Sequence, residues 1–327
     1  MRWRSVRLSW LVVAVALLLY PFVLTGAFYE RMGADLLLAA IAASAWNIVG
    51  GYAGQVSVGH AVFFGAGAYA PLLLFTHWAI PPVLGVPLGM IVSIVIAIVI
   101  GVPTFRLQGH YFSMATIAVA ELIRIVVSNV DFLGAAVGMM GPAVPRTVLD
   151  LSFRSAVPYY YIFLAVLALI LGLTHFLSRG RMGYYWRAIR AGERAARSLG
   201  VPVRRYKLYA LMLSAAYTSL AGSLYALMVG FIDPESGFGI LVSVEMIITA
   251  ALGGIGTLLG PLLGAAILVP LKTATNSLFG GGGSGLTYIL YGGIILVLAR
   301  FEPGGLLELW RRIAARASRK RSVTRAA

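Results

Sequence analysis

Residues 187–226, RAIRAGERAARSLGVPVRRYKLYALMLSAAYTSLAGSLYA, join a basic, alanine-rich segment to an apolar one. The first part has the composition of an amphipathic helix at a water-facing surface, and the second part can continue into hydrocarbon. A basic helix between membrane spans offers a surface on which a soluble partner can dock. We therefore expect a membrane protein that presents a helical docking surface on one side.

The composition also indicates a helical membrane protein. Of the 327 residues, 60% are hydrophobic and 11% are charged, whereas soluble domains carry about 25% charged residues. Several apolar runs can cross about 30 Å of hydrocarbon at about 1.5 Å per residue, and they are continuous rather than alternating, which excludes a β-barrel. The predicted fold class is an all-α integral membrane protein, a polytopic bundle of about 8–10 transmembrane helices with broken or Gly-rich segments.

We expect a single transmembrane domain over residues 1–310 and a basic cytoplasmic tail over residues 311–327. The N-terminal run resembles a signal peptide, but its apolar part is too long and lacks a clear cleavage site, so we expect an uncleaved first span. The candidate spans cover residues 8–28, 35–52, 56–78, 83–102, 110–130, 157–177, 208–230, 240–270 (a span plus a broken one) and 286–300.

Positive charge gathers in three segments. The formal net charge is +15, and 20 of the 26 Lys and Arg residues lie at the N-terminus, in the loop 178–207 or from Arg300 onward. Basic residues mark cytoplasmic loops, so both termini and this loop are expected in the cytoplasm, and the charge needs no nucleic acid to explain it. The stretches 131–156 and 231–238 are expected outside. The longer of the two is either a docking surface or a plain connector.

Two glycine-rich segments interrupt the apolar sequence, one in each half of the chain. They are GGYAGQVSVGHAVFFGAG over residues 50–67 and GGIGTLLGPLLG over residues 253–264. Paired segments of this kind mark broken helices at the binding sites of transporters. Small residues also allow two helices to pack closely, so both interpretations stay open.

Polar residues within the apolar segments are candidates for a substrate path. Charges inside a span are costly and are usually paired or directed into a cavity. Glu121 and Arg124 either neutralise each other on one helix face or contribute to the path. Glu245 has no basic residue nearby in the sequence, so it is expected to face a cavity, a partner helix or the outer interface. Four further residues could bind an α-amino and α-carboxyl group or form interhelical hydrogen bonds: Asn47, Gln55, Ser57 and His60.

Five stretches of the chain carry a family likeness. They are SAWNIVGGYAGQVSVGHAVFFGAGAYA (44–70), FRLQGHYFSMATIAVAELIRIVV (105–127), the stretch 187–226, SVEMIITAALGGIGTLLGPLLGA (243–265) and FEPGGLLEL (301–309). In this order they resemble the M-type permease subunit of branched-chain amino acid ABC importers.

The resemblance implies a function and a set of partners. The partners would be a second permease subunit forming a heterodimer, two cytoplasmic ATP-binding subunits, an external solute-binding protein and the lipid of a bacterial or archaeal cytoplasmic (inner) membrane. The cargo would be branched-chain or related amino acids, moved by alternating access. Related permeases carry urea and other small amides, so a urea or amide permease is the alternative. No cofactor is implied.

The basic segment over residues 187–200, which we call the docking loop, resembles the coupling loop of ABC permeases, in which a Glu and an Ala pair precede a Gly. Arg194 is inserted between the Glu and the Ala pair, so the spacing is one residue longer than in the strict pattern. Gly200 is expected to end the helix as a C′ glycine, with arginines three and four apart along one side. The alternative is a basic loop that lies on lipid. The expected coupling residues are Arg190, Glu193, Ala195, Ala196 and Gly200.

The sequence predicts a non-catalytic membrane subunit. There is no Walker motif, since GGGGSG over residues 280–285 lacks the lysine, and there is no catalytic triad, paired carboxylate or metal-ligand cluster. If ATP drives this protein, another chain must hydrolyse it. A self-contained channel or secondary transporter remains a second hypothesis: the intramembrane carboxylates favour it, and the docking loop argues against it.

Overall fold

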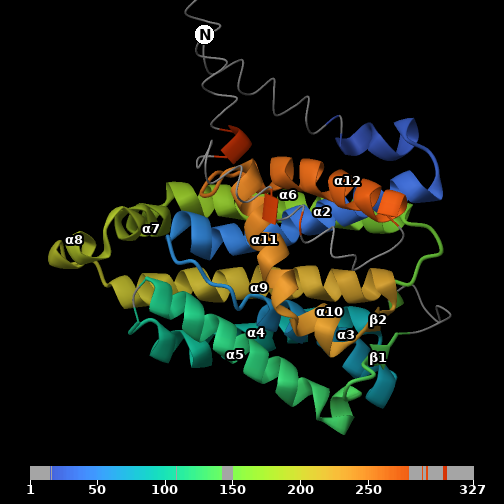
Figure 1. Ribbon diagram of the computed structural model, residues 1–327, viewed down its shortest axis with the longest axis horizontal. Coiled ribbons are helices and arrows are strands. Elements are labelled where there is room, and N and C mark those ends of the chain that lie inside the picture. The colour runs from blue at the N-terminus through green and yellow to red at the C-terminus, as the bar shows by residue number, and fades with distance from the viewer. Residues whose placement is uncertain are drawn as a thin grey trace, which may run out of the picture.

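Most of the long helices run along the longest axis of the molecule (Figure 1). The computed structural model describes residues 15, 17–107, 109–141, 150–279, 289, 292–293 and 305–307. The long helices are α2 (Ala27–Asn47), α3 (Ala61–Trp78), α4 (Gly85–Thr104), α5 (His110–Ser128), α6 (Val157–Arg179), α9 (Val203–Val229), α11 (Ile240–Gly253) and α12 (Gly260–Phe279).

Short elements connect the long helices. Two of them, α7 (Arg181–Ala191) and α8 (Glu193–Ser198), project from one end of the molecule, and we call this the loop end (Figure 1). At the opposite end, β1 (Met139–Met140) pairs antiparallel with β2 (Phe231–Ile232), and we call this the strand end. The remaining short elements are α10 (Pro234–Phe238), a π-helical turn (Ile48–Tyr52) and two 3-10 turns (Pro82–Leu84 and Asp131–Leu133).

The predicted all-α polytopic membrane fold is confirmed. Within the described residues, seven helical segments are long and apolar enough to cross a membrane. Helix α12 has the length of a span but is not among these seven, and its second half carries polar residues such as Lys272, Thr273 and Asn276. Of the expected span 8–28, the structure describes residue 15 and residues 17–28: they are helical as far as residue 23, the chain then leaves the helix at residues 24–26, and α2 begins at Ala27. The expected span 286–300 lies largely outside the described residues, and the expected tail over residues 311–327 lies wholly outside them.

Two of the expected spans have different limits because the chain leaves the α-helix inside them. The expected span 56–78 begins only at Ala61, since residues 53–60 are irregular. The expected stretch 240–270 divides into α11 and α12, separated by residues 254–259. Both breaks fall in the Gly-rich segments, so the segments do interrupt the helices, while their place at a binding site stays a prediction.

Close packing accounts for other glycines of the same segments. Helix α9 lies at the centre of the bundle and packs against α3 through small residues. A Cβ on Gly67 of α3 would collide with the carbonyl of Ser219, and a Cβ on Gly222 of α9 would collide with the carbonyl of Phe64. The two helices therefore meet backbone to backbone at a pair of reciprocal glycine contacts.

We expect Gly222→Ala to lower the free energy of unfolding by about 1–3 kcal/mol, because the added methyl group meets a backbone carbonyl that cannot rotate away. The matched control is Gly172→Ala in α6, where an added Cβ meets no atom within 4 Å. Thermal unfolding in detergent, followed by tryptophan fluorescence, compares the two variants. Equal melting temperatures would contradict the close-packing interpretation.

Candidate functional site

The two Gly-rich segments, far apart in the sequence, are joined by the side chain of Asn47. This residue ends α2 and is buried. Its Nδ2 donates to the carbonyl of Thr257 at 2.8 Å, and its Oδ1 accepts from the backbone N–H of Gly256 at 2.7 Å. The π-helical turn that follows is closed by a bond from the N–H of Ala53 to the carbonyl of Ile48. It packs against the same loop, because a Cβ on Gly51 would lie 2.5 Å from the backbone nitrogen of Gly256.

Ser57 and His60 form a second buried network. Nδ1 of His60 lies 3.1 Å from Oγ of Ser57, and its Nε2 lies 2.8 Å from Oγ of Ser214 on α9. Oγ of Ser214 donates to the carbonyl of Ala45 at 2.6 Å. Nε1 of Trp46 donates to the carbonyl of Ser57 at 2.7 Å, which holds the irregular segment against α2.

The structure places most of the expected path residues away from the cavity of about 460 Å³ between α2, α11 and α12. Asn47 bonds to the loop between α11 and α12, and His60 bonds to Ser214 of α9, so both make long-range hydrogen bonds of the kind that the alternative interpretation expected. Oγ of Ser57 bonds to His60 within the same irregular segment. Gln55 is partly exposed, and its Nε2 bonds only weakly, at 3.3 Å, to the neighbouring carbonyl of Gly54. A role of these four residues in a substrate path stays a prediction.

Arg190 connects the loop end to both Gly-rich segments. It lies near the end of α7, and its backbone and side chain approach Gly54, where a Cβ would be 3.1 Å from its Cα. Its guanidinium lies so close to Gly256 that a Cβ there would collide with Nη1. Both glycines have positive φ, +71° and +78°, the left-handed region that other residues enter at a cost. Movement of α7 would therefore act directly on both turns.

The loop itself is two short helices rather than the single helix expected over residues 187–200. The chain is extended at Gly192, which separates α7 from α8. The prediction that Gly200 ends the helix is confirmed, because its φ is +79° and its N–H bonds to the carbonyl of Arg197 at 3.0 Å. The N–H of Val201 bonds back to Ala196 at 3.1 Å, which completes a Schellman motif.

One alanine of the loop's Ala pair is buried in the protein, and the other is exposed on its surface. Ala196 is buried against Ile189 and Val203, whereas Ala195 is exposed. Trp186, also buried, donates from Nε1 to the carbonyl of Tyr206 at 3.0 Å and fixes α7 on α9. Only the outer side of α8 is therefore free to meet a partner.

Glu193 fixes the loop to α9 through a buried cation. Its Oε2 accepts from Nζ of Lys207 at 2.5 Å, and its Oε1 accepts from Arg197 at 3.2 Å. The side chain of Lys207 is fully buried, and its Nζ lies 5.8 Å from the ring centroid of Phe105. Glu193 is thus the acidic partner that a buried ammonium requires.

Leu199 was missed by the sequence analysis. It is 83% exposed at the tip of the loop, next to the glycine that turns the chain. A large apolar side chain at the most exposed point of a basic loop is a candidate for insertion into a partner. The signal in the sequence was a single leucine between Ser198 and Gly200, off the face that Ala196 buries.

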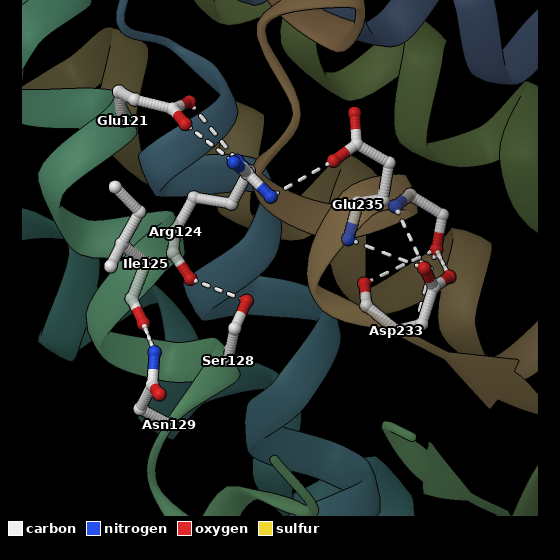
Figure 2. Close-up of polar contacts among 8 residues, drawn as sticks. Glu121, Arg124, Ile125, Ser128, Asn129, Asp233 and Glu235 are labelled. Atoms are coloured by element: carbon white, nitrogen blue, oxygen red, sulfur yellow. Dashed lines mark hydrogen bonds and ion pairs between the residues drawn. The ribbon is translucent and has the colours of Figure 1, made fainter. Parts of the chain in front are cut away.

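Glu121 and Arg124 form the ion pair expected on one face of α5. Arg124 donates to both carboxylate oxygens of Glu121, at 2.5 and 3.0 Å, and its Nη1 also bonds to Glu235 at 3.1 Å (Figure 2). Glu235 belongs to α10, whose first turn is capped by the side chain of Asp233. Arg124 therefore connects a long helix to the short helix that leads into α11.

Glu245 faces a cavity of about 460 Å³ and is paired across it. Both of its carboxylate oxygens accept from Nζ of Lys272 on α12, at 2.8 and 2.9 Å. Arg31 and Asp35 of α2 form a second ion pair on the same wall, at 3.3 Å. Glu245 is the single expected path residue that lines this cavity, and it has the basic partner that its local sequence lacked.

Three of the four charges in the cavity were missed, although the sequence carried a signal for each. Arg31 and Asp35 are four residues apart at the start of an apolar run, the spacing of an ion pair on a helix. Lys272 is the only basic residue between Lys207 and Arg300. Its isolation in an apolar region indicated a cavity or a buried carboxylate.

Taken together, the helices define a polytopic membrane protein with a loop fixed to α9 at one end and a partly open, charged cavity between α2, α11 and α12. Residues 31–299 match the family described as the permease component of branched-chain amino acid transport systems. The chain belongs to this family, and it is a multi-pass membrane protein of that permease class.

Individual relatives agree with the family. The chain is 28% identical to the high-affinity branched-chain amino acid transport system permease protein LivM of Salmonella typhimurium, over 92% of this chain and 74% of the relative. It is 28% identical to LivM of Escherichia coli, over 81% of this chain and 66% of the relative. It is 38% identical to the autoinducer 2 import system permease protein LsrC of Klebsiella pneumoniae, over 33% of each chain.

Proposed function

We propose that this chain is a transmembrane permease subunit of an ABC importer for branched-chain or related amino acids. Two separate cytoplasmic ATP-binding subunits would drive alternating access, a second permease would complete the heterodimer, and an external solute-binding protein would deliver the cargo. The loop end and both termini would face the cytoplasm. The chain itself would position, guide and release the solute without covalent chemistry.

The observation that carries this proposal is the construction of the loop end. A permease driven by a separate motor needs a loop that transmits force rather than one that bends. Three contacts stiffen this loop: the bond from Trp186 to Tyr206, the pair between Glu193 and Lys207, and the burial of Ala196. Such stiffening supports a coupling role more than a loop that only rests on lipid.

The same construction offers a route from the loop to the solute path. Arg190 touches the turns at Gly54 and Gly256, and Asn47 joins the two segments that contain these turns. A displacement of α7 would therefore move both breaks together rather than one of them. Alternating access requires this kind of concerted movement, because one side of the path must close as the other opens.

The exposed surface for the motor would centre on Leu199 and Ala195. We expect Leu199→Asp to lower transport-coupled ATPase activity at least about tenfold, because a charge would replace an apolar side chain that must leave water in the contact. Leu199→Met is the matched control and is expected to retain the activity. The readout is ATP hydrolysis by the assembly in proteoliposomes, with and without solute. Equal activity of the two variants would contradict the coupling assignment.

A second experiment tests the class of transporter. Purification of this chain from its membrane in mild detergent is expected to bring ATP-binding subunits and a second permease with it. A chain that purifies alone and moves solute into liposomes without ATP would overturn the proposal. It would instead favour a self-contained carrier that depends on its intramembrane carboxylates.

A further inference from the structure

A cavity of about 460 Å³ lies between α2, α11 and α12. We propose that it binds one zwitterionic amino acid with an aliphatic side chain during transport. This inference rests on the proposed importer function and adds to it a ligand site within this subunit, together with the chemical features of the ligand that the site recognises.

The charges on the cavity wall are the first observation behind this proposal. Two cations, Arg31 and Lys272, and two anions, Asp35 and Glu245, line the same space and sum to zero net charge. Each pair is formed within the wall, and all four side chains remain 30–45% exposed. Charges are kept in such apolar helices where they are paired or face a polar path.

A zwitterion matches this wall better than an ion of one sign. A free anion would be attracted by each cation and repelled by the carboxylate that is paired with it. The ligand's α-carboxylate would lie beside one of the two cations, and its α-ammonium would lie beside one of the two carboxylates. The existing ion pairs and the ligand would then form one network of alternating charges. The guanidinium of Arg31 has five N–H donors, of which the pair with Asp35 uses Nε, and each carboxylate has several acceptor positions, so the Arg31–Asp35 pair leaves capacity for a ligand.

The apolar part of the wall determines the side chain of the ligand. Asn47 at the end of α2 bonds to Thr257, just before α12 begins, while Arg31 near the start of α2 shares the cavity with Lys272 of the second half of α12. The two helices therefore run antiparallel, and residues further along α2 lie beside earlier residues of α12. These deeper positions on α2 and α12 are apolar: Leu38, Ala39, Ala42 and Val269. On α11, Met246 adds an apolar side chain, and the hydroxyl of Thr249, one turn beyond Glu245, is already bonded to the carbonyl of Glu245.

The size of the cavity agrees with a ligand of this kind. A volume of about 460 Å³ falls in the usual range of small-molecule pockets, roughly 300–1,000 Å³. On α2 the charged residues lie near the start of the helix, and the apolar residues Leu38, Ala39 and Ala42 lie about one to two turns beyond Asp35. A ligand with a charged head and a short branched hydrocarbon end would place its head against the charged residues and its hydrocarbon end against the apolar residues.

The binding test uses the purified assembly without its solute-binding protein and measures leucine directly. Competition by 4-methylpentanoate, which lacks the amine, and by 3-methylbutylamine, which lacks the carboxylate, is expected to be at least about tenfold weaker than by leucine. Alanine, with three fewer carbons, is also expected to bind at least about tenfold more weakly. Equal binding of leucine and either one-charge analogue would overturn the proposal.

The variant Glu245→Gln distinguishes a contact residue from a structural one. If Glu245 meets the ammonium group, the variant binds leucine more weakly and discriminates less between leucine and 4-methylpentanoate. If Glu245 only supports the fold, the affinities for both compounds fall together and their ratio stays the same. An unchanged ratio contradicts the assignment of Glu245 to the ligand.

A labelling experiment locates the site independently of affinity. The chain contains no cysteine, so Thr273→Cys places one thiol in the cavity wall and Ser277→Cys places one a turn further along α12, where it is exposed. Leucine is expected to slow the reaction of Cys at position 273 with a charged thiol reagent at least about threefold, and to leave position 277 unaffected. Equal rates at position 273 with and without leucine would overturn the proposal.

The two proposals fail in different ways. If the assembly imports leucine with ATP but position 273 is not protected and the analogue ratio does not change, the cavity site is wrong and the importer function stands. If the chain carries no ATP-binding subunits and shows no ATP-dependent uptake, the importer function is wrong. The cavity site, which rests on that function, then falls as a transport site even if leucine binds there.

Discussion

Glu193→Ala is expected to lower the free energy of unfolding by about 3–5 kcal/mol, because it leaves the buried ammonium group of Lys207 without a partner. The Lys207 side chain is fully buried, and its Nζ lies 2.5 Å from the Glu193 carboxylate. A charge in such surroundings cannot regain its hydration unless the loop opens. We therefore expect the loop to detach from α9 before the rest of the protein unfolds, with loss of coupled ATPase activity.

The controls separate the buried pair from the exposed one. Arg197→Ala removes the other partner of Glu193, and the Arg197 side chain is more than half exposed. This variant is therefore expected to lower the free energy of unfolding by no more than about 0.5 kcal/mol. The double variant Glu193→Ala with Lys207→Met also removes the buried ammonium group. It should therefore regain most of the stability that Glu193→Ala alone loses. Thermal unfolding in detergent measures all three. A double variant as unstable as Glu193→Ala would contradict this explanation.

Asn47→Leu is expected to lower the free energy of unfolding by about 2–6 kcal/mol. The substitution removes the partners of two backbone groups, the N–H of Gly256 and the carbonyl of Thr257, at about 1–3 kcal/mol each. Leucine has a similar volume, so the effect reports hydrogen bonding rather than an empty space. The loss should also separate the two Gly-rich turns and reduce transport.

Ser44→Ala provides the matched control, one turn earlier on the same helix. The hydroxyl of Ser44 is buried and has no hydrogen-bond partner within the described part of the chain. Its removal should leave stability unchanged or raise it slightly. The melting temperatures of the two variants, measured side by side, test whether Asn47 acts through its two bonds. A loss for Asn47→Leu no larger than that for Ser44→Ala would refute this role.

The sequence predicted the class of fold well because membrane spans are local features. An apolar run of about 20 residues forms a helix, since hydrocarbon offers the backbone no other partner. The limits were wrong where the chain leaves the helix at residues 53–60 and 254–259. There, contacts with distant residues replace the missing helical hydrogen bonds, and no local pattern reports them.

The candidate site was predicted only where its partners are neighbours in the sequence. Glu121 and Arg124 are three residues apart on one helix, and their pairing was foreseen. The partners of Asn47 lie 209 and 210 residues away, and the partner of Glu245 lies on the next helix, 27 residues along. Only the fold brings such residues together. The isolation of Lys272 among apolar residues was the one sequence signal that it faces a cavity or a carboxylate.

The two ends of α2 have different mechanical constraints. Asn47 pins its last turn to the loop before α12, while Arg31, near its first turn, borders an open cavity. Their separation of 16 residues along the helix makes a lever arm of about 24 Å, so a tilt of about 5° about the pin would move the charged end by about 2 Å. A displacement of that size is enough to open or close a hydrogen bond. Small rotations driven through Arg190 at the pinned end would thus be amplified at the charged end, without breaking the bonds of the pin.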